Sequence, residues 1–410
     1  MSRMRKHLWL DILAGLVVVA GVAGLVIYVT SRDKSPKPTP FPTASMIAQE
    51  SPTPSPSPSP THLNLGTWPT YGYDNARTRF DPDVQVRPPF RIKWRWRPGD
   101  LLEFPPSIYR NCLYICTEHG YIWCITSRTH NSKWRHKFSG KLASAPTIAD
   151  GKVYITTFSG MLVVIDSYKG KILWKYPCGS SESSPLVYDG RVYFGNRSGL
   201  MSAVDIKTHK LAWKYQTGGK ITGAPALLNG RIVIGSYDGS VYCFSPGGQL
   251  FWRHSASGVL SSDAFYATPA LAYDTAYIGS IGNRIYAFDL QNGGTRWSYS
   301  TGAWVYSSPA VWHGLVFEGS YDGYFYALGA ANGRLAWRFN AGGKISGSPS
   351  VIDGVVYVST ISNHTWGLDA RTGKVLWSFP DGAYTPIAAD AKHLYFCGAK
   401  TLYCLMQKGQ

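Results

Sequence analysis

Most of the chain alternates short apolar runs with turns built from Gly, Asp and Asn. Residues 349–377 show the pattern: four short β-branched or aromatic runs are separated by such turns. The apolar positions within them do not recur with the period of a helix, so each run is predicted to be a strand. The same arrangement returns along the chain, which predicts an all-β protein made of four-stranded units.

Tryptophans mark the repeat length. The eight residues that carry it are spaced by 40, 40, 39, 39, 45, 40 and 40 positions; they are Trp94, Trp134, Trp174, Trp213, Trp252, Trp297, Trp337 and Trp377. A fixed period near 40 indicates one supersecondary unit copied many times. Four short strands per copy are typical of the blade of a β-propeller.

Prolines count the blades independently, because a residue without an N–H suits the start of a first strand. Eight of them open eight units: Pro106, Pro146, Pro185, Pro225, Pro269, Pro309, Pro349 and Pro386. The last unit ends after two runs, near Leu394–Cys397 and Leu402–Leu405, and lacks a fourth strand, whereas a spare segment, Ile92–Trp96, precedes the first unit. We expect that segment to complete the last blade and remove its open edge. Seven blades and a decayed repeat are the alternative.

Local sequence supports this architecture. Asp150-Gly151, Asp189-Gly190, Asn229-Gly230 and Asp353-Gly354 lie between the first two predicted strands of their units and suit two-residue turns with positive φ. The repeated tryptophans are expected to pack between neighbouring blades, with the indole N–H as a polar handle.

The first 65 residues differ from the rest. Residues 1–7 form a basic tail, residues 8–29 carry one charge and are long enough for a transmembrane signal-anchor helix, and residues 30–65 are a Pro/Ser/Thr-rich, disordered stalk. The propeller is predicted over residues 66–410. A cleavable signal peptide is the alternative, but the residues after the apolar run make a poor cleavage site.

The N-terminal helix predicts a location. Basic residues are nearly balanced on its two sides, and a short N-terminal tail usually stays in the cytoplasm. We therefore expect a single-pass protein of the plasma membrane, with the stalk and propeller on the extracytoplasmic side.

Charge and cysteine content narrow the partners. The net charge is +17, of which the first 61 residues supply +3, so about +14 falls on the propeller. Such a field favours anionic surfaces or polymers, although a soluble basic surface without a specific partner is equally consistent. No nucleic-acid motif is present.

Of seven cysteines, Cys116 with Cys124 and Cys397 with Cys404 are either pairs facing across hairpins or small buried residues.

The segment Leu368–Trp377, Leu-Asp-Ala-Arg-Thr-Gly-Lys-Val-Leu-Trp, resembles the tryptophan-docking repeat of the pyrroloquinoline-quinone (PQQ) propeller superfamily. Residues 165–174 and 204–213 are degenerate copies, and Thr67–Arg79 is similar to the lead-in of bacterial members. The resemblance implies one of two functions. Quinoprotein dehydrogenases bind PQQ with calcium and oxidise alcohols or sugars, whereas other members are non-catalytic docking platforms. Compact repeats without adjacent cysteines favour the platform, without a cofactor or catalytic residues.

One end of the channel is the candidate binding face. Linkers between blades converge there, and several carry residues that a repeat does not require: Glu103, Glu182, Asp263, Tyr266, Trp304, Tyr306 and Tyr384. Carboxylates beside aromatic rings suit a cation, a basic peptide or a sugar; alternatively, they cap strand ends. Asp238 and Asp322 are predicted to be turn formers and His119 a solvent-facing residue. No histidine pair has zinc-ligand spacing.

Together these observations predict a membrane-tethered binding or scaffold platform for a cell-envelope protein or an acidic polymer. A PQQ- and calcium-dependent dehydrogenase is the alternative. The sequence leaves the oligomeric state open.

Overall fold

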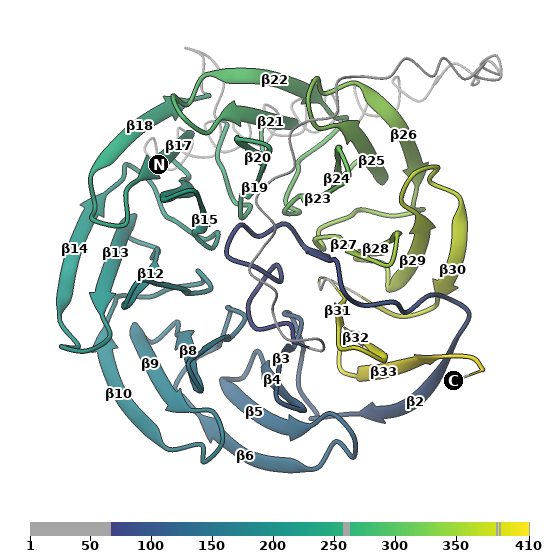
Figure 1. Cartoon of the computed structure of the whole chain (residues 1–410), viewed down its shortest axis with the longest axis horizontal. Coiled ribbons are helices and arrows are strands. Elements are labelled where there is room, and N and C mark those ends of the chain that lie inside the picture. The colour runs from purple at the N-terminus through teal and green to yellow at the C-terminus, as the bar shows by residue number, and fades with distance from the viewer. Residues whose placement is uncertain (1–66, 257–262, 383, 385–386, 410) are drawn as a thin grey trace, which may run out of the picture. The chain divides into compact units, whose positions relative to one another are not determined.

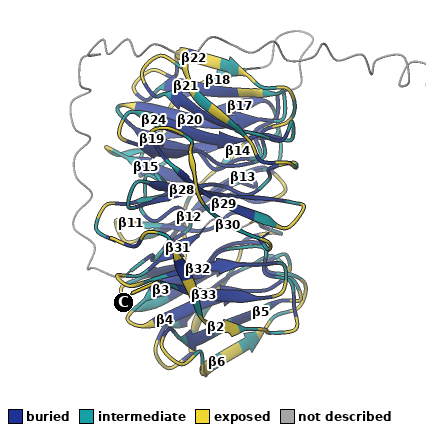
Figure 2. Cartoon of the chain, turned by 90° about the vertical axis from the view of Figure 1, so that its right-hand side faces the viewer, coloured by how far each residue is buried: buried dark blue, intermediate teal, exposed yellow. Residues whose placement is uncertain are grey.

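The structure, a computed structural model, describes residues 67–256, 263–382, 384 and 387–409. Within these residues, eight sheets surround a central channel (Figure 1), which confirms the eight-bladed propeller. The inner strands are buried on both faces, and every second residue of the outermost strands is exposed (Figure 2). This burial explains why the inner strands read as continuous apolar runs.

The first seven blades each contain four antiparallel strands in chain order, from the channel outward. Blades 1 to 4 comprise β3 (Ser107–Tyr109), β4 (Cys112–Cys116), β5 (Tyr121–Thr126) and β6 (Ser132–Lys137); β7 (Thr147–Ala149), β8 (Lys152–Thr156), β9 (Met161–Asp166) and β10 (Ile172–Pro177); β11 (Leu186–Tyr188), β12 (Arg191–Phe194), β13 (Leu200–Asp205) and β14 (Leu211–Gln216); β15 (Ala226–Leu228), β16 (Arg231–Gly235), β17 (Ser240–Phe244) and β18 (Leu250–Ser255). Blades 5 to 7 comprise β19 (Ala270–Ala272), β20 (Thr275–Ser280), β21 (Arg284–Asp289) and β22 (Thr295–Ser300); β23 (Ala310–Trp312), β24 (Leu315–Gly319), β25 (Tyr324–Gly329) and β26 (Leu335–Asn340); β27 (Ser350–Ile352), β28 (Val355–Thr360), β29 (His364–Asp369) and β30 (Val375–Phe379). In each of these blades, the first strand begins at the residue after the predicted proline.

The eighth blade joins the two ends of the propeller. Its inner strands are β31 (Ala388–Ala389), β32 (His393–Cys397) and β33 (Leu402–Gln407), and its outer strand is β2 (Phe90–Trp96). β2 runs antiparallel to β33, with Trp94 opposite Cys404. The predicted closure is therefore confirmed, and the seven-blade alternative is wrong. The strand begins two residues earlier than predicted, because Phe90 also pairs, with Gln407.

The hairpin turns have the predicted backbone. Asp150 and Gly151 have φ angles of 47° and 69°, and the other three predicted pairs have nearly the same values. Other residues adopt the same turn without the sequence signature: Arg110-Asn111 has φ angles of 47° and 60°. The twist of the flanking strands sets the type of turn. Residues that tolerate a positive φ less well than Gly therefore still adopt this turn.

The repeated tryptophans connect neighbouring blades as predicted. In six of the eight, the indole N–H donates to a backbone carbonyl of the next blade, at 2.8 Å from Trp297 to Ala330. Gly333 lies against the Trp297 ring with φ of 67°, and a Cβ there would fall 2.7 Å from ring carbons. Where the repeat has no glycine, a histidine with positive φ covers the ring instead, as His209 stacks on Trp174 at 4.6 Å.

The lead-in fills the channel, which the sequence did not predict. We call residues 67–81 the plug. Its backbone carbonyls accept N–H groups from the inner strands of several blades, among them Ile148, Leu227 and Val351 at 2.7–2.8 Å. It ends in β1 (Phe80–Asp81), which runs parallel to β27. In Figure 1 the plug is the dark purple segment that crosses the centre of the ring.

Two arginines fix the plug to the ring. Arg77 is fully buried; its Nε donates to the carbonyl of Pro225 and its Nη2 to that of Pro185, both at 3.1 Å. Arg79 is also fully buried and donates to the carbonyl of Pro309 at 3.0 Å. The carbonyls of three opening prolines thus accept hydrogen bonds from the plug arginines at the channel wall.

The predicted N-terminal segments and the cysteine pairs are compared with the structure as follows. The predicted helix over 8–29 and the stalk over 30–65 lie outside the described residues; within those residues, no helix is long and apolar enough to cross a bilayer. The seven cysteines are buried free thiols. Cys116 lies opposite Ile122, and Cys397 opposite Leu402, so neither proposed pair faces directly across its hairpin. The structure thus agrees with the alternative, in which these four cysteines are small buried residues.

Candidate binding site at the channel mouth

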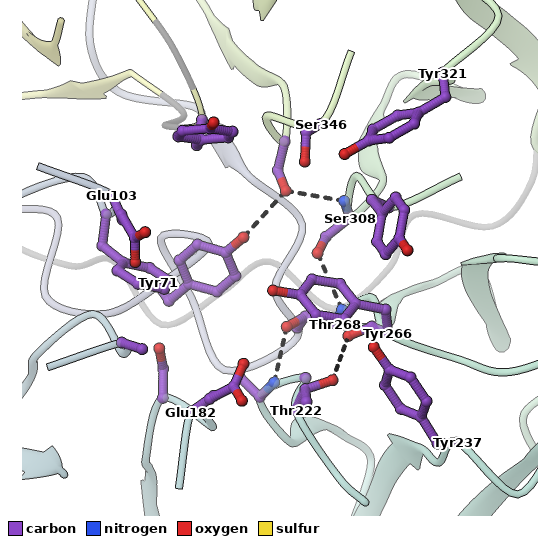
Figure 3. Close-up of a pocket in the computed structure, with 18 residues that line it drawn as sticks. Tyr71, Glu103, Glu182, Thr222, Tyr237, Tyr266, Thr268, Ser308, Tyr321 and Ser346 are labelled. Carbon is purple, nitrogen blue, oxygen red and sulfur yellow. Dashed lines mark hydrogen bonds between the residues drawn. The ribbon is translucent and has the colours of Figure 1, made fainter. Parts of the chain in front are cut away.

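A pocket of about 390 Å³ opens at one end of the channel (Figure 3). Its walls come from the linkers that connect each blade's outer strand to the next inner strand, and from turns between second and third strands. Its floor includes Tyr71 of the plug. We call it the mouth pocket.

Five of the seven predicted binding residues line the mouth pocket: Glu103, Glu182, Tyr266, Tyr306 and Tyr384. Trp304 stands outside this lining, half exposed, with its ring 5.9 Å from that of Tyr306.

Asp263 does not belong to the pocket lining. Its side chain is only 4% exposed, and it accepts hydrogen bonds from the Tyr286 hydroxyl at 2.5 Å and the Ser280 hydroxyl at 3.4 Å. Asp263 thus bonds to side-chain hydroxyls of blade 5, which differs both from a pocket residue and from the strand-end cap that was the alternative. We leave it out of the candidate site.

Sequence reasoning missed three tyrosines of the pocket: Tyr71, Tyr237 and Tyr321. The last two belong to Ser-Tyr-Asp-Gly turns, for which the sequence analysis considered the aspartates and not the tyrosines. Those aspartates are turn formers, as predicted: Asp238 accepts the N–H of Gly218 at 2.8 Å, and Asp322 that of Gly302 at 2.7 Å. A tyrosine repeated at the same turn position in two blades was the available signal.

Aromatic rings form a continuous arc along one wall. The ring of Tyr266 lies 6.2 Å from that of Tyr237 and 5.1 Å from that of Tyr306, both edge to face. Tyr306 lies 4.9 Å from Tyr321. Such a chain of edge-to-face contacts holds each ring in place, so the arc is preorganised for contact with a ligand. We call these four tyrosines the tyrosine arc.

Small hydroxyls at the base of the pocket have structural partners. The Ser348 hydroxyl accepts the N–H of Ser308 at 2.9 Å, and the Ser308 hydroxyl accepts the N–H of Thr268 at 3.0 Å. The Tyr71 hydroxyl bonds to Ser348 at 3.0 Å. These hydrogen bonds, drawn as dashed lines in Figure 3, join the residues that lead into blades 5, 6 and 7 to one another and to the plug. They explain these residues without a ligand.

The tyrosine arc and Glu103 have no such explanation. To the described residues, the four arc hydroxyls and the Glu103 carboxylate make no hydrogen bond or ion pair. Glu182 differs, because Arg197 donates to its Oε1 at 2.6 Å. In Figure 3 the two glutamates face the arc from the other side of the pocket. The pocket thus offers ring faces, free hydroxyls and one unpaired carboxylate.

Burial sets the protonation of these groups. It raises the pKa of Glu103, an effect that nearby Lys141 partly offsets and that Glu118 and Glu182 strengthen. Burial also raises the pKa of Tyr237 to about 12 and that of Tyr266 further, so both hydroxyls stay protonated donors at neutral pH. Burial acts in the same direction on Tyr71, but the Arg79 charge and the Ser348 hydrogen bond outweigh it, and its pKa falls.

His119 has the predicted exposure. Its side chain is 75% exposed, and its Nδ1 bonds to Asp100 Oδ1 at 2.5 Å. Within the described residues, no three His, Cys, Asp or Glu side chains gather as a metal site.

Solved structures with the same fold include a BamB protein and two dehydrogenases. BamB from Moraxella catarrhalis superposes with a TM-score of 0.68 at 19% identity, over 78% of this chain and 100% of that one. A europium-containing methanol dehydrogenase gives 0.73 at 13% identity, over 83% and 98%. The quinohemoprotein alcohol dehydrogenase from Comamonas testosteroni gives 0.73 at 14%, over 84% and 81%. These likenesses show the fold alone.

A curated relative and a family model add sequence evidence. The 1-butanol dehydrogenase (cytochrome c) of Thauera butanivorans is 25% identical over 127 residues, which are 27% of this chain and 18% of that protein. The chain therefore spans about a fifth of that relative. The family model described as outer membrane protein assembly factor BamB matches residues 91–299, 237–328 and 301–398. These matches cover most of the propeller, and the chain belongs to this BamB propeller family.

Proposed function

We propose that the protein is a membrane-tethered, extracytoplasmic scaffold that binds a cell-envelope partner, a protein or an acidic polymer, in the mouth pocket and carries out no reaction. One observation carries the proposal. The tyrosine arc and Glu103 gather unpaired polar groups in a concave site on a rigid ring, where loops usually carry function. Membership of the BamB propeller family supports a scaffold, and the apolar run over 8–29 supports the tether.

Crosslinking in intact cells tests the platform. A photoreactive amino acid at Tyr306 is expected to capture a macromolecule, and the same label at Tyr168 is the control. Tyr168 is an exposed aromatic residue, 76% accessible, in a turn between third and fourth strands, at the end of its blade away from the mouth. Capture at Tyr168 but not at Tyr306 would place the binding face elsewhere. Without capture at either position, the platform has no support.

The tether and its orientation need a separate test. Protease added to intact protoplasts is expected to cut within residues 35–61 and release the propeller, because alternating prolines there cannot pack into a core. The released fragment is measured in the supernatant by immunoblotting. Full protection until the cells are lysed would reverse the orientation, and a propeller that stays with the membrane after cleavage would contradict the stalk.

The alternative function is a quinoprotein dehydrogenase, favoured by the shared fold and by the short match to the 1-butanol dehydrogenase. The residues of the mouth pocket do not fit its cofactor. PQQ is a tricarboxylate, and bound calcium needs several oxygen ligands that include carboxylates. Here one pocket glutamate is held by Arg197, so among the described residues of the lining Glu103 is the one unpaired carboxylate, too few for the several oxygen ligands that calcium requires. We derive no catalytic step for this pocket.

An activity assay decides between the two functions. The purified full chain, mixed with PQQ and calcium, is expected not to reduce an artificial electron acceptor with a panel of alcohols and sugars. A control without quinone sets the background. Turnover above that background, lost in Glu103→Ala or Glu182→Ala, would replace the scaffold by an enzyme.

A further inference from the structure

The mouth pocket has two chemically different sides. The tyrosine arc spans the linkers and turns of blades 4 to 6, whereas Glu103 precedes blade 1 and Glu182 precedes blade 3. A ligand in the pocket therefore meets aromatic faces on one side and carboxylate oxygens on the other. The volume of about 390 Å³ falls in the range of small-molecule sites, so the pocket takes a compact group rather than a flat protein surface.

A sugar ring matches both sides. Its C–H face is apolar and packs on an aromatic ring, while its hydroxyls, which project around the edge, both donate and accept hydrogen bonds. The arc hydroxyls have both capacities, and the Glu103 carboxylate accepts. None of these groups is bonded to another described residue, so a sugar would displace only water from them.

Basic side chains surround the same pocket. The ammonium of Lys220 lies 4.0 Å from the centre of the Tyr237 ring, and that of Lys344 lies 5.6 Å from the Tyr321 ring, so a lysine stands at each end of the arc. Lys141 and Arg197 lie on the carboxylate side, where Lys141 is 3.6 Å from Glu118. Because a cation above a ring keeps its N–H donors, the two arc lysines can still bind an anion.

This rim argues against a cationic ligand. The outer rings of the arc already carry lysines of this chain, and the propeller field of about +14 repels a basic group on approach. An anionic polymer is attracted by the same field. The unpaired Glu103 faces inward, where it meets the ligand's hydroxyls rather than its charges.

We propose that the mouth pocket binds an acidic glycan, with one sugar ring against the tyrosine arc and its acidic substituents on Lys220 and Lys344. This inference rests on the proposed function and names its ligand class. The acidic substituent is a carboxylate or a phosphate, since an ammonium binds either.

Calorimetric titration of the purified full chain in mild detergent tests the proposal with five probes. Two are acidic glycans: tetragalacturonate, which carries carboxylates, and pentamannose 6-phosphate. Maltotetraose has sugar rings without charge, hexaglutamate has charge without sugar, and tetralysine represents a basic peptide. At physiological salt, at least one acidic glycan is expected to bind at least tenfold more tightly than maltotetraose and hexaglutamate, and to weaken as salt rises.

Variants assign the binding to the pocket. Tyr266→Ala and, as a second variant with a more exposed ring, Tyr306→Ala are each expected to weaken the acidic glycan by about tenfold or more. Lys220→Ala combined with Lys344→Ala should reduce the preference for the acidic over the neutral glycan. Tyr168→Ala is the matched control, because Tyr168 also lies beneath a lysine, Lys133 at 5.2 Å, but away from the mouth. Each variant's melting curve confirms folding.

The other outcomes separate this inference from the proposed function. Equal binding of hexaglutamate, unchanged in the tyrosine variants, would mean a general polyanion surface and overturn the glycan. Binding of tetralysine that Glu103→Gln abolishes would indicate a basic peptide partner; the glycan would be wrong and the scaffold would stand. If no acidic glycan binds while Tyr306 still captures a partner in cells, only the glycan inference fails. If capture fails as well, both fail.

Discussion

Arg77 of the plug and the tyrosine arc of the mouth pocket lie along one channel but differ in how far their polar groups are paired. In the plug, every nitrogen of the Arg77 guanidinium donates a hydrogen bond, to Pro185, Pro225, Thr70 or Tyr71. In the pocket, the hydroxyls of the tyrosine arc and the Glu103 carboxylate bond to no described residue. A buried polar group that is fully paired is explained by the fold, whereas gathered unpaired groups call for a ligand.

The difference also separates stability from binding. Because the plug satisfies carbonyls on several blades, its side chains should matter for folding. The arc hydroxyls and the Glu103 carboxylate bond to no described residue, so removing them leaves no partner among those residues unsatisfied. Substitutions in the two regions should therefore have opposite signatures, a loss of stability in the first and a loss of binding in the second.

The largest expected effect is on the plug. Arg77→Met removes four hydrogen bonds, leaves the Pro225 carbonyl without its arginine donor and leaves the Pro185 carbonyl with the Thr147 hydroxyl alone, which should cost about 3 kcal/mol or more. Thermal unfolding followed by tryptophan fluorescence measures it. Arg197→Met, at the exposed edge of the pocket, is the control and should melt close to the wild type. Equal melting of both variants would contradict the structural role of the plug.

A pair of single-hydroxyl deletions sharpens the same contrast. The Tyr286 hydroxyl donates to buried Asp263 at 2.5 Å, so Tyr286→Phe leaves a buried carboxylate short of a donor and should cost about 1–3 kcal/mol. Tyr306→Phe removes a hydroxyl that has no partner among the described residues and should leave the melting temperature nearly unchanged. If Tyr306→Phe destabilised the protein as much as Tyr286→Phe, the arc hydroxyls would have partners within the protein.

The repeated features could be predicted from the sequence because each of them recurs in most of the repeats. Eight tryptophans, eight prolines and a recurring turn all point to one period, so the blade number, the closing strand and the location of the indole rings could be predicted. Five of the pocket residues were also found: four as departures from the repeat three residues before an opening proline, and Tyr384 as a further residue of these linkers. A residue can be recognised as a departure from the repeat only where the other repeats are regular at that position.

Features that occur once, or that depend on side-chain direction, could not be predicted. The plug has no second copy in the sequence, and nothing in its residues shows that Arg77 and Arg79 reach the carbonyls that open blades 3, 4 and 6. Asp263 shares a linker with Tyr266, yet its side chain turns toward Tyr286 inside the blade. Tyr237 and Tyr321 lie in turns that approach the linkers only in three dimensions.

Glu318 allows the effect of burial on a carboxyl group to be tested without a ligand, through the pH dependence of the protein's stability. It is fully buried on β24, its Oε1 accepts the Ser307 hydroxyl at 2.6 Å, and burial holds its pKa well above the usual range. The folded state therefore keeps a proton that the unfolded state loses, and stability falls as pH rises above the ordinary pKa of a glutamate. The slope is about 1 kcal/mol per pH unit or less. Glu318→Gln should remove it, measured as melting temperature from pH 5 to 8; an unchanged slope would contradict a protonated Glu318.

The smallest expected effect on stability is at Glu103, and it tests the comparison most closely. Burial raises its pKa, so the folded carboxyl holds its proton to higher pH than the unfolded one, and the carboxylate is slightly unfavourable at neutral pH. Glu103→Gln should therefore leave stability unchanged or raise it by a few tenths of a kcal/mol, because the half-buried group is screened by solvent. Binding of an acidic glycan should nevertheless change: wild-type affinity should decline as pH falls through the raised pKa and the charged acceptor becomes a weaker, neutral one, and the decline should be smaller in Glu103→Gln. Melting curves and titrations over the same pH range measure both quantities. If Glu103→Gln destabilised the protein and left the pH dependence of binding unaltered, Glu103 would belong with the plug residues, as a group that the fold requires.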